Sequence, residues 1–117
     1  MAFAFEDLQV YQRALDFAVT VIGEVDQIQT PRRHYRLIEQ LESSCTSVAL
    51  NISEGKGLYS KKEFKHFLYV ARGSLCETVT MLQIFRRRNW LTESRYLFLY
   101  RAAQEIHKML SGLIRSI

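Results

Sequence analysis

Residues 38–68 read IEQLESSCTSVALNISEGKGLYSKKEFKHFL and predict two helices joined by a short turn. Apolar residues at positions 38, 41, 45, 48 and 52 follow the three-then-four spacing of one helix face. We expect this helix to end near Glu54, because Gly55 and Gly57 tolerate the left-handed backbone that terminates helices. Ser60 and Glu63 then form a capping box, in which each side chain satisfies a backbone donor of the next helix.

The same spacing continues on both sides of this stretch. The other apolar stripes are Leu8, Tyr11, Leu15, Ala18, Ile22 and Val25; Phe64, Leu68, Ala71, Leu75 and Leu82; and Tyr96, Leu99, Ala103, Ile106, Leu110, Leu113 and Ile117. We expect helices over about 6–28, from Thr30 and Pro31 to 54, over 60–89, and from Thr92 onward. Because the connections are short, the sequence predicts an all-α, antiparallel up-down-up-down four-helix bundle, with residues 1–117 in a single domain.

The composition predicts a soluble cytoplasmic protein. With 117 residues and 48% hydrophobic content, the chain can cover one core without a metal or a disulfide. Cys45 lies on an apolar stripe and Cys76 lies beside one, so both are expected to be reduced thiols. No apolar run reaches the roughly 18 residues of a membrane span, and residues 1–5 do not have the pattern of a signal peptide.

Positive charge gathers where the predicted helices begin and end. The formal net charge is +4 and the pI is near 9.3, which favours polyanionic partners. The residues predicted to bind nucleic acid are Arg32, Arg33 and Arg36; Lys56, Lys61, Lys62 and Lys65; and Arg86, Arg87 and Arg88. Cations in the first turn of a helix oppose its dipole, so the clusters at Arg32 and Lys61 work slightly against helix stability.

Two of the predicted helices carry more apolar residues than a single core-facing stripe requires. The additional residues are Val10, Ala14, Phe17 and Val21 in the first helix, and Phe67, Val70, Met81 and Ile84 in the third. We expect Val10, Phe17, Val21, Phe67 and Val70 to form an interface between copies of the chain. The alternative is a wide core with a few exposed apolar residues.

The residue patterns of enzymes and metal sites are not met. Di-metal bundles use two Glu-x-x-His motifs, whereas this chain has one, from Glu63 to His66. Cys45 lies on an apolar stripe that disfavours a thiolate, and residues 55–57 do not have the spacing of a phosphate-binding loop. We therefore expect no enzymatic activity, no metal and no cofactor.

Three polar residues remain to be explained. Asn51 and Glu54 lie at the end of the second predicted helix, and Glu77 lies in the middle of the third. We interpret them as a structural polar network in which a partly buried Glu77 requires a partner such as Arg72. The other interpretation is a binding site, since partly buried carboxylates often have shifted pKa values.

Four motifs in order resemble a known family. They are FEDLQVYQ at 5–12, NISEG at 51–55, Glu63-Phe64 with Phe67-Leu68, and ARGSLCE at 71–77. Together they resemble the four-helix-bundle proteins encoded by intervening sequences of bacterial 23S ribosomal RNA genes. The resemblance implies a cyclic homopentamer without known catalytic activity. It also implies similarity in fold to the accessory variability protein of diversity-generating retroelements, which binds nucleic acid and a reverse transcriptase. Members often carry a basic residue just after the glycine turn, where this chain has Leu58 and Tyr59.

Two functions follow from these features. The first is a homo-oligomer, most simply a pentamer, that binds RNA or DNA without strong sequence preference, because clustered lysine and arginine contact phosphates. A ring of five subunits would carry a formal charge of about +20. The second is a protein-interaction scaffold, for example for a reverse transcriptase or another nucleic-acid enzyme, without direct nucleic-acid binding. The residues do not identify the nucleic acid or the protein partner.

Overall fold

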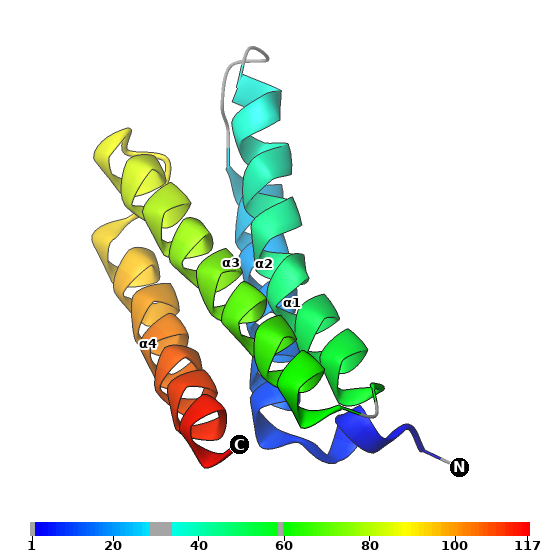
Figure 1. Ribbon diagram of the computed structural model, residues 1–117. Coiled ribbons are helices and arrows are strands. Elements are labelled where there is room, and N and C mark those ends of the chain that lie inside the picture. The colour runs from blue at the N-terminus through cyan, green and yellow to red at the C-terminus, as the bar shows by residue number, and fades with distance from the viewer. Residues whose placement is uncertain (1, 29–33, 59) are drawn as a thin grey trace.

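A computed structural model describes residues 2–28, 34–58 and 60–117 of the protein. A short 3-10 helix, η1, spans Ala4–Asp7 and leads into the first long helix, α1, at Gln9–Gln27. Three further helices follow: α2 at Tyr35–Lys56, α3 at Lys61–Arg87 and α4 at Glu93–Ser116. Consecutive long helices run in opposite directions, and both chain ends lie at the same end of the molecule (Figure 1). The predicted all-α four-helix bundle is confirmed.

The four helices enclose one core in an elongated molecule of 45 × 24 × 22 Å. Each helix packs against two neighbours: α1 against α2 and α4, and α3 against α2 and α4. An ion pair between Arg95 of α4 and Glu24 of α1 joins the two helices that are furthest apart in sequence. Leucine, isoleucine and phenylalanine fill the centre, where Leu41, Leu75 and Phe85 are fully buried. No helix among the described residues is both long and apolar enough to cross a membrane.

The seam between α2 and α3 combines a close backbone approach with hydroxyl contacts. A Cβ added at Gly55 would lie 2.6 Å from the Cβ of Phe67, a distance that atoms cannot adopt, so only glycine fits there. Further along the seam, Ser47 and Ser74 share a hydrogen bond of 2.9 Å, and Thr78 donates to Ser44 at 2.9 Å. Ser44 precedes Ser47 in α2, whereas its partner Thr78 follows Ser74 in α3, as an antiparallel helix pair requires.

The predicted helix ends at Ser60, Asn89 and Thr92 are confirmed. The Ser60 hydroxyl accepts a hydrogen bond from the Glu63 backbone N–H, and the Thr92 hydroxyl accepts one from the Arg95 N–H. Asn89, directly after α3 and its C-cap residue, has a φ of 62°, which is the left-handed conformation expected of it. The predicted cap at Thr30 and Pro31 lies outside the described residues.

Two boundary predictions are wrong. Glu6 belongs to η1 and not to α1, because Leu8 adopts an extended conformation and interrupts the helix before Gln9. Helix α2 does not end near Glu54 but continues to Lys56, and Gly55 is a buried helical residue without a positive φ. The physical reason for Gly55 is therefore the contact with Phe67 and not a left-handed turn.

Three residues predicted to form an intersubunit face belong to the core. Val10, Phe17 and Val21 of α1 are only 4%, 3% and 0% exposed. Because α1 packs against both α2 and α4, its buried face is wider than a single stripe, and these side chains fill it. The alternative of a wide core is the correct interpretation for α1, whereas Val70 of α3 does reach the surface with 40% exposure.

The two cysteines differ in their surroundings. Cys45 is fully buried, and desolvation, reinforced by the nearby Glu42 carboxylate, raises the pKa of its thiol to about 11. Cys76 is exposed on α3. At neutral pH the Cys45 thiol stays protonated and inaccessible, so Cys76 is the one that reagents reach in the folded protein.

The seam generates a stability prediction. Gly55→Ala is expected to lower the free energy of unfolding by about 1–3 kcal/mol, because the added methyl forces α2 away from Phe67. Gly23→Ala is the matched control, since a Cβ there meets nothing within 4 Å and alanine is the better helix former. Urea denaturation followed by circular dichroism measures both. Equal stability of the two variants would show that the α2–α3 approach does not require glycine.

Candidate nucleic-acid interface

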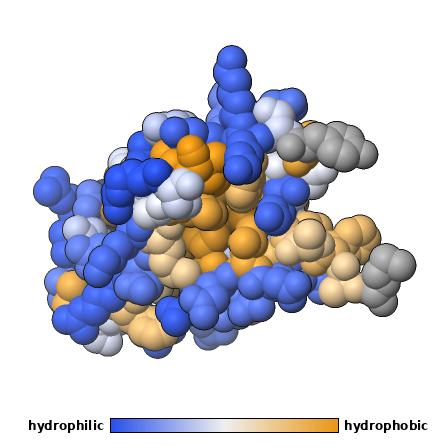
Figure 2. Space-filling model, turned by 60° about the horizontal axis from the view of Figure 1, so that its bottom comes forward, coloured by the Kyte–Doolittle hydropathy of each residue, from blue (hydrophilic) through white to orange (hydrophobic). Residues whose placement is uncertain are grey.

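One group of cations surrounds the junction of α2 and α3, at the end of the bundle that carries both chain termini (Figure 1). Lys56 closes α2, and Lys61, Lys62 and Lys65 lie in the first two turns of α3. Lys56 lies over the Phe64 ring at 5.5 Å, and no described carboxylate pairs with the other three lysines. Figure 2, which looks toward this end, shows apolar side chains with hydrophilic ones around them. We call these four residues the lysine end.

The lysine end coincides with a helix N-terminus. The first backbone N–H groups of α3 have no carbonyl partner within the helix, and the Ser60 hydroxyl satisfies the one at Glu63. Three lysines thus lie at the start of α3, beside its free backbone N–H groups and the positive end of its dipole. This combination favours an anion, and phosphate oxygens accept hydrogen bonds from both donor types.

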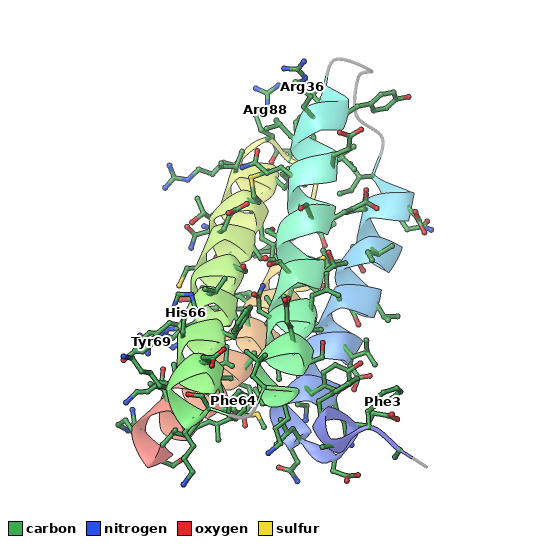
Figure 3. The ribbon with its side chains drawn as sticks, turned by 45° about the vertical axis from the view of Figure 1, so that its right-hand side comes forward. Phe3, Arg36, Phe64, His66, Tyr69 and Arg88 are labelled. Carbon is green, nitrogen blue, oxygen red and sulfur yellow. The ribbon has the colours of Figure 1, made fainter. Side chains whose placement is uncertain are left out.

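A second group of cations lies at the opposite end of the bundle, where α2 begins and α3 ends. Arg36 projects from α2 and Arg88 from the end of α3, close together in the view of Figure 3. Arg87 and Arg88 are exposed, and the Arg88 guanidinium lies 5.7 Å from the centre of the Trp90 ring. Arg36, Arg87 and Arg88 form what we call the arginine end. Arg32 and Arg33, predicted to belong with them, lie outside the described residues.

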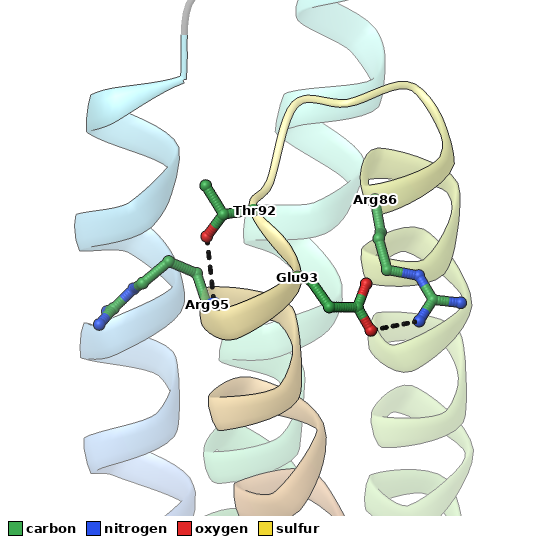
Figure 4. A network of polar contacts seen from close by, with 4 residues as sticks. All are labelled: Arg86, Thr92, Glu93 and Arg95. Carbon is green, nitrogen blue, oxygen red and sulfur yellow. Dashed lines mark hydrogen bonds and ion pairs between the residues drawn. The ribbon is translucent and has the colours of Figure 1, made fainter.

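Arg86 has a structural role. Its Nη1 donates to Glu93 Oε1 at 3.4 Å, next to the Thr92 cap (Figure 4). Its guanidinium also lies 4.1 Å from the centre of the Tyr96 ring. These contacts join the end of α3 to the start of α4 and partly offset the charge of Arg86. Of the predicted binding residues, Arg86 is therefore the least available to a phosphate.

Aromatic residues that the sequence reading did not select support the arginine end. The rings of Phe85 and His34 lie 5.0 and 4.7 Å from that of Trp90, so the indole is packed between α2 and α3. Trp90 in turn contacts Arg88, which orders this guanidinium at the surface. The available signal was the Arg88-Asn89-Trp90 sequence at the predicted helix end.

The two groups of cations are far apart within one chain. They occupy opposite ends of a molecule that is 45 Å long. Each subunit therefore has two separate basic surfaces, because antiparallel helices place the beginning and the end of α3 at opposite ends.

The predicted polar network is only partly present. The Asn51 amide donates to the Ser47 carbonyl at 2.8 Å and to the Ser47 hydroxyl at 2.9 Å, which links it to the α2–α3 seam. Glu54 and Glu77 are both exposed. The expectation of a partly buried Glu77 paired with Arg72 is wrong, since Arg72 donates instead to Ser111 of α4 at 3.1 Å.

A further concentration of cations was missed by the sequence reading. A groove between α3 and α4 is lined in part by Lys108 and Arg115 of α4. These residues are separated by other residue types in the sequence, and they align only because positions 108, 111 and 115 share one helix face. Within the described part of the chain, no group of three or more metal-ligating side chains occurs.

Comparisons with known proteins place this geometry in context. Residues 6–112 match the family model described as 23S rRNA-intervening sequence protein. The fold is similar to a solved protein of unknown function from the S23 ribosomal protein family of Bacteroides thetaiotaomicron VPI-5482. The TM-score is 0.83 at 26% sequence identity, over 90% of this chain and 97% of that one. No curated protein matches the chain.

Proposed function

This chain belongs to the 23S rRNA-intervening sequence protein family, and we propose that it is a non-enzymatic homo-oligomer that binds nucleic acid through its basic ends. The solved S23 relative is described as a protein of unknown function, so the proposal rests on the chain's own residues. The observation that carries it is the lysine end, where unpaired cations adjoin a helix N-terminus. The repulsion between each of these cations and the α3 dipole costs about 0.3–1 kcal/mol. A bound phosphate offsets this cost because it attracts both the cations and the positive end of the helix.

The chemistry of the two ends supports binding without strong sequence preference. Lysine and arginine side chains and helix N-termini contact phosphate oxygens, which are the same in every nucleotide. The cations lie at the ends of helices and not along one exposed helix face that could enter a major groove. RNA and DNA are therefore both candidate ligands, and affinity should depend on ionic strength.

Self-association is supported by an apolar strip on α1 and α2. Leu15, Val19 and Leu50 are 44%, 66% and 62% exposed, and Leu15 and Leu50 border a shallow groove that also includes Tyr11 and Ala49. We call Leu15, Val19 and Leu50 the apolar strip, and it takes the role that was expected of Val10, Phe17 and Val21. Burying the strip against another copy removes three large side chains from water. Repetition around a ring, a pentamer by the family resemblance, would multiply the basic ends.

The scaffold function remains the second candidate because of the same apolar strip. An exposed apolar surface also suits a different protein, such as a reverse transcriptase or another nucleic-acid enzyme. In that case the basic ends keep the protein soluble and make no contact with nucleic acid.

The first test measures binding to oligonucleotides. Labelled duplex and single-stranded oligonucleotides should bind at about 50 mM salt and dissociate as salt rises. Replacing Lys61, Lys62 and Lys65 with alanine is expected to reduce the duplex salt slope by about 0.9 for each lysine that contacts a phosphate. Fluorescence anisotropy at several salt concentrations gives the slope.

The matched control for this test is Arg13→Ala with Arg101→Ala, which removes exposed cations from the sides of the bundle. This double variant should keep most of the salt slope. Absence of binding at about 50 mM salt would contradict the nucleic-acid function and favour the scaffold.

The second test concerns the apolar strip. Val19→Asp with Leu50→Asp should convert the oligomer to a monomer, because burying unpaired carboxylates in an apolar interface costs several kcal/mol. Phe98→Asp on α4 is the control, since Phe98 is also exposed but lies outside the strip. Multi-angle light scattering at micromolar concentration reports the mass. A monomeric parent protein, or an oligomer that survives the double substitution, would contradict this interface.

A further inference from the structure

A groove with a volume of about 500 Å³ lies between α3 and α4. Helix α3 contributes Leu75, Cys76 and Val79 to its lining. Helix α4 contributes the remaining residues: Tyr100, Ala103, Gln104, His107, Lys108, Ser111 and Arg115. This volume lies within the roughly 300–1,000 Å³ range of small-molecule sites.

The groove changes in polarity along its length. Because α3 and α4 are antiparallel, Val79 of α3 lies toward Tyr100 of α4, and these two partly exposed side chains make this half apolar. In the other half, Lys108 and Arg115 project from the same face of α4, about 10 Å apart along the helix. The groove is thus apolar at one end and cationic at the other.

Arg72 adds a third cation at the polar end. Its Nη1 donates to the Ser111 hydroxyl at 3.1 Å and its guanidinium lies 5.0 Å from the Tyr69 ring centre, so it is held beside the groove. No aspartate or glutamate occurs among the described lining residues. The charge of the groove therefore selects an anion.

Size and chemistry favour a small molecule over a macromolecule. Ten residues line the groove, whereas a stable protein interface uses roughly 20–30 residues on each side. A nucleic-acid duplex offers phosphates to the cations but has no alkyl groups to cover the partly exposed Val79 and Tyr100. A small molecule with one apolar part and one anionic part satisfies both halves.

We infer that the α3–α4 groove binds a free aliphatic carboxylate. Its alkyl chain lies on Val79 and Tyr100, which are partly exposed, and its carboxylate accepts hydrogen bonds from Lys108 and Arg115. Charge-assisted hydrogen bonds of this kind are short and strong, and arginine engages a carboxylate through two parallel bonds. None of the residues of the lysine end or the arginine end lines this groove, so the site does not depend on nucleic-acid binding.

Cys76 reports occupancy of the groove without any label. It lines the groove and is exposed, whereas Cys45 is buried and has a raised pKa of about 11. Iodoacetamide, a small neutral reagent, should therefore alkylate Cys76 alone in the folded protein. Intact-mass spectrometry follows the rate as decanoate is added below its micellar concentration.

Bound decanoate is expected to slow Cys76 alkylation at least about fivefold and in a saturable manner. The neutral analogue 1-decanol should require at least about tenfold more ligand, because it cannot pair with the cations. Lys108→Gln with Arg115→Gln should raise the apparent Kd for decanoate by about tenfold or more. Arg13→Gln, which removes one positive charge from α1, should leave the Kd unchanged.

Four outcomes would overturn the inference. One is equal protection by decanoate and 1-decanol, and another is an unchanged Kd in the Lys108 and Arg115 double variant whose circular dichroism matches the parent. The third is alkylation that slows as protein concentration rises without ligand, which would show that a second copy covers the groove. Protection by anionic lipid vesicles but not by decanoate would assign the groove to a membrane surface and would also overturn it. Oligonucleotide binding is measured separately, so either proposal fails on its own.

Discussion

The close contact between α2 and α3 is the constraint on which the rest of the structure depends. Gly55 lets the backbone of α2 approach Phe67, and the hydroxyls of Ser47 and Ser74 meet further along the same seam. This contact fixes the register of the two helices, so Lys56 lies beside the first turn of α3. The same register places the beginning of α2 beside the end of α3, and Arg36 and Arg88 both lie at this arginine end. Local packing therefore determines where the charges of this bundle are displayed.

Much of the fold follows from short-range signals in the sequence. Apolar spacing predicts the helices, and Ser60, Asn89 and Thr92 predict their ends, because caps depend on neighbouring residues alone. Tertiary contacts decide the rest. A stripe on α1 does not reveal that this helix packs on two neighbours, so Phe17 was expected at the surface. A glycine near a helix end suits a left-handed turn and a close approach equally well, and at Gly55 the neighbouring helix decides between them.

The basic residues illustrate the same division. Runs such as Lys61-Lys62 and Arg87-Arg88 are visible because their members are adjacent in the sequence. The cationic half of the α3–α4 groove is not visible, because Arg72, Lys108 and Arg115 come from separate turns of two helices. Nor does the sequence indicate that Arg86 forms an ion pair with Glu93 and lies over the Tyr96 ring. A cation's contribution to binding depends on its neighbours in space, and those are determined by the fold.

Hydrogen–deuterium exchange with and without a bound oligonucleotide tests the central claim most directly. The amides of Lys61 and Lys62 have no helical acceptor, so they should exchange rapidly in the free protein. The account predicts slower exchange there and across residues 86–89 when oligonucleotide binds, with no change around Gly23 in the middle of α1. Binding that leaves both ends unchanged, or that protects only the sides of the bundle, would contradict the account.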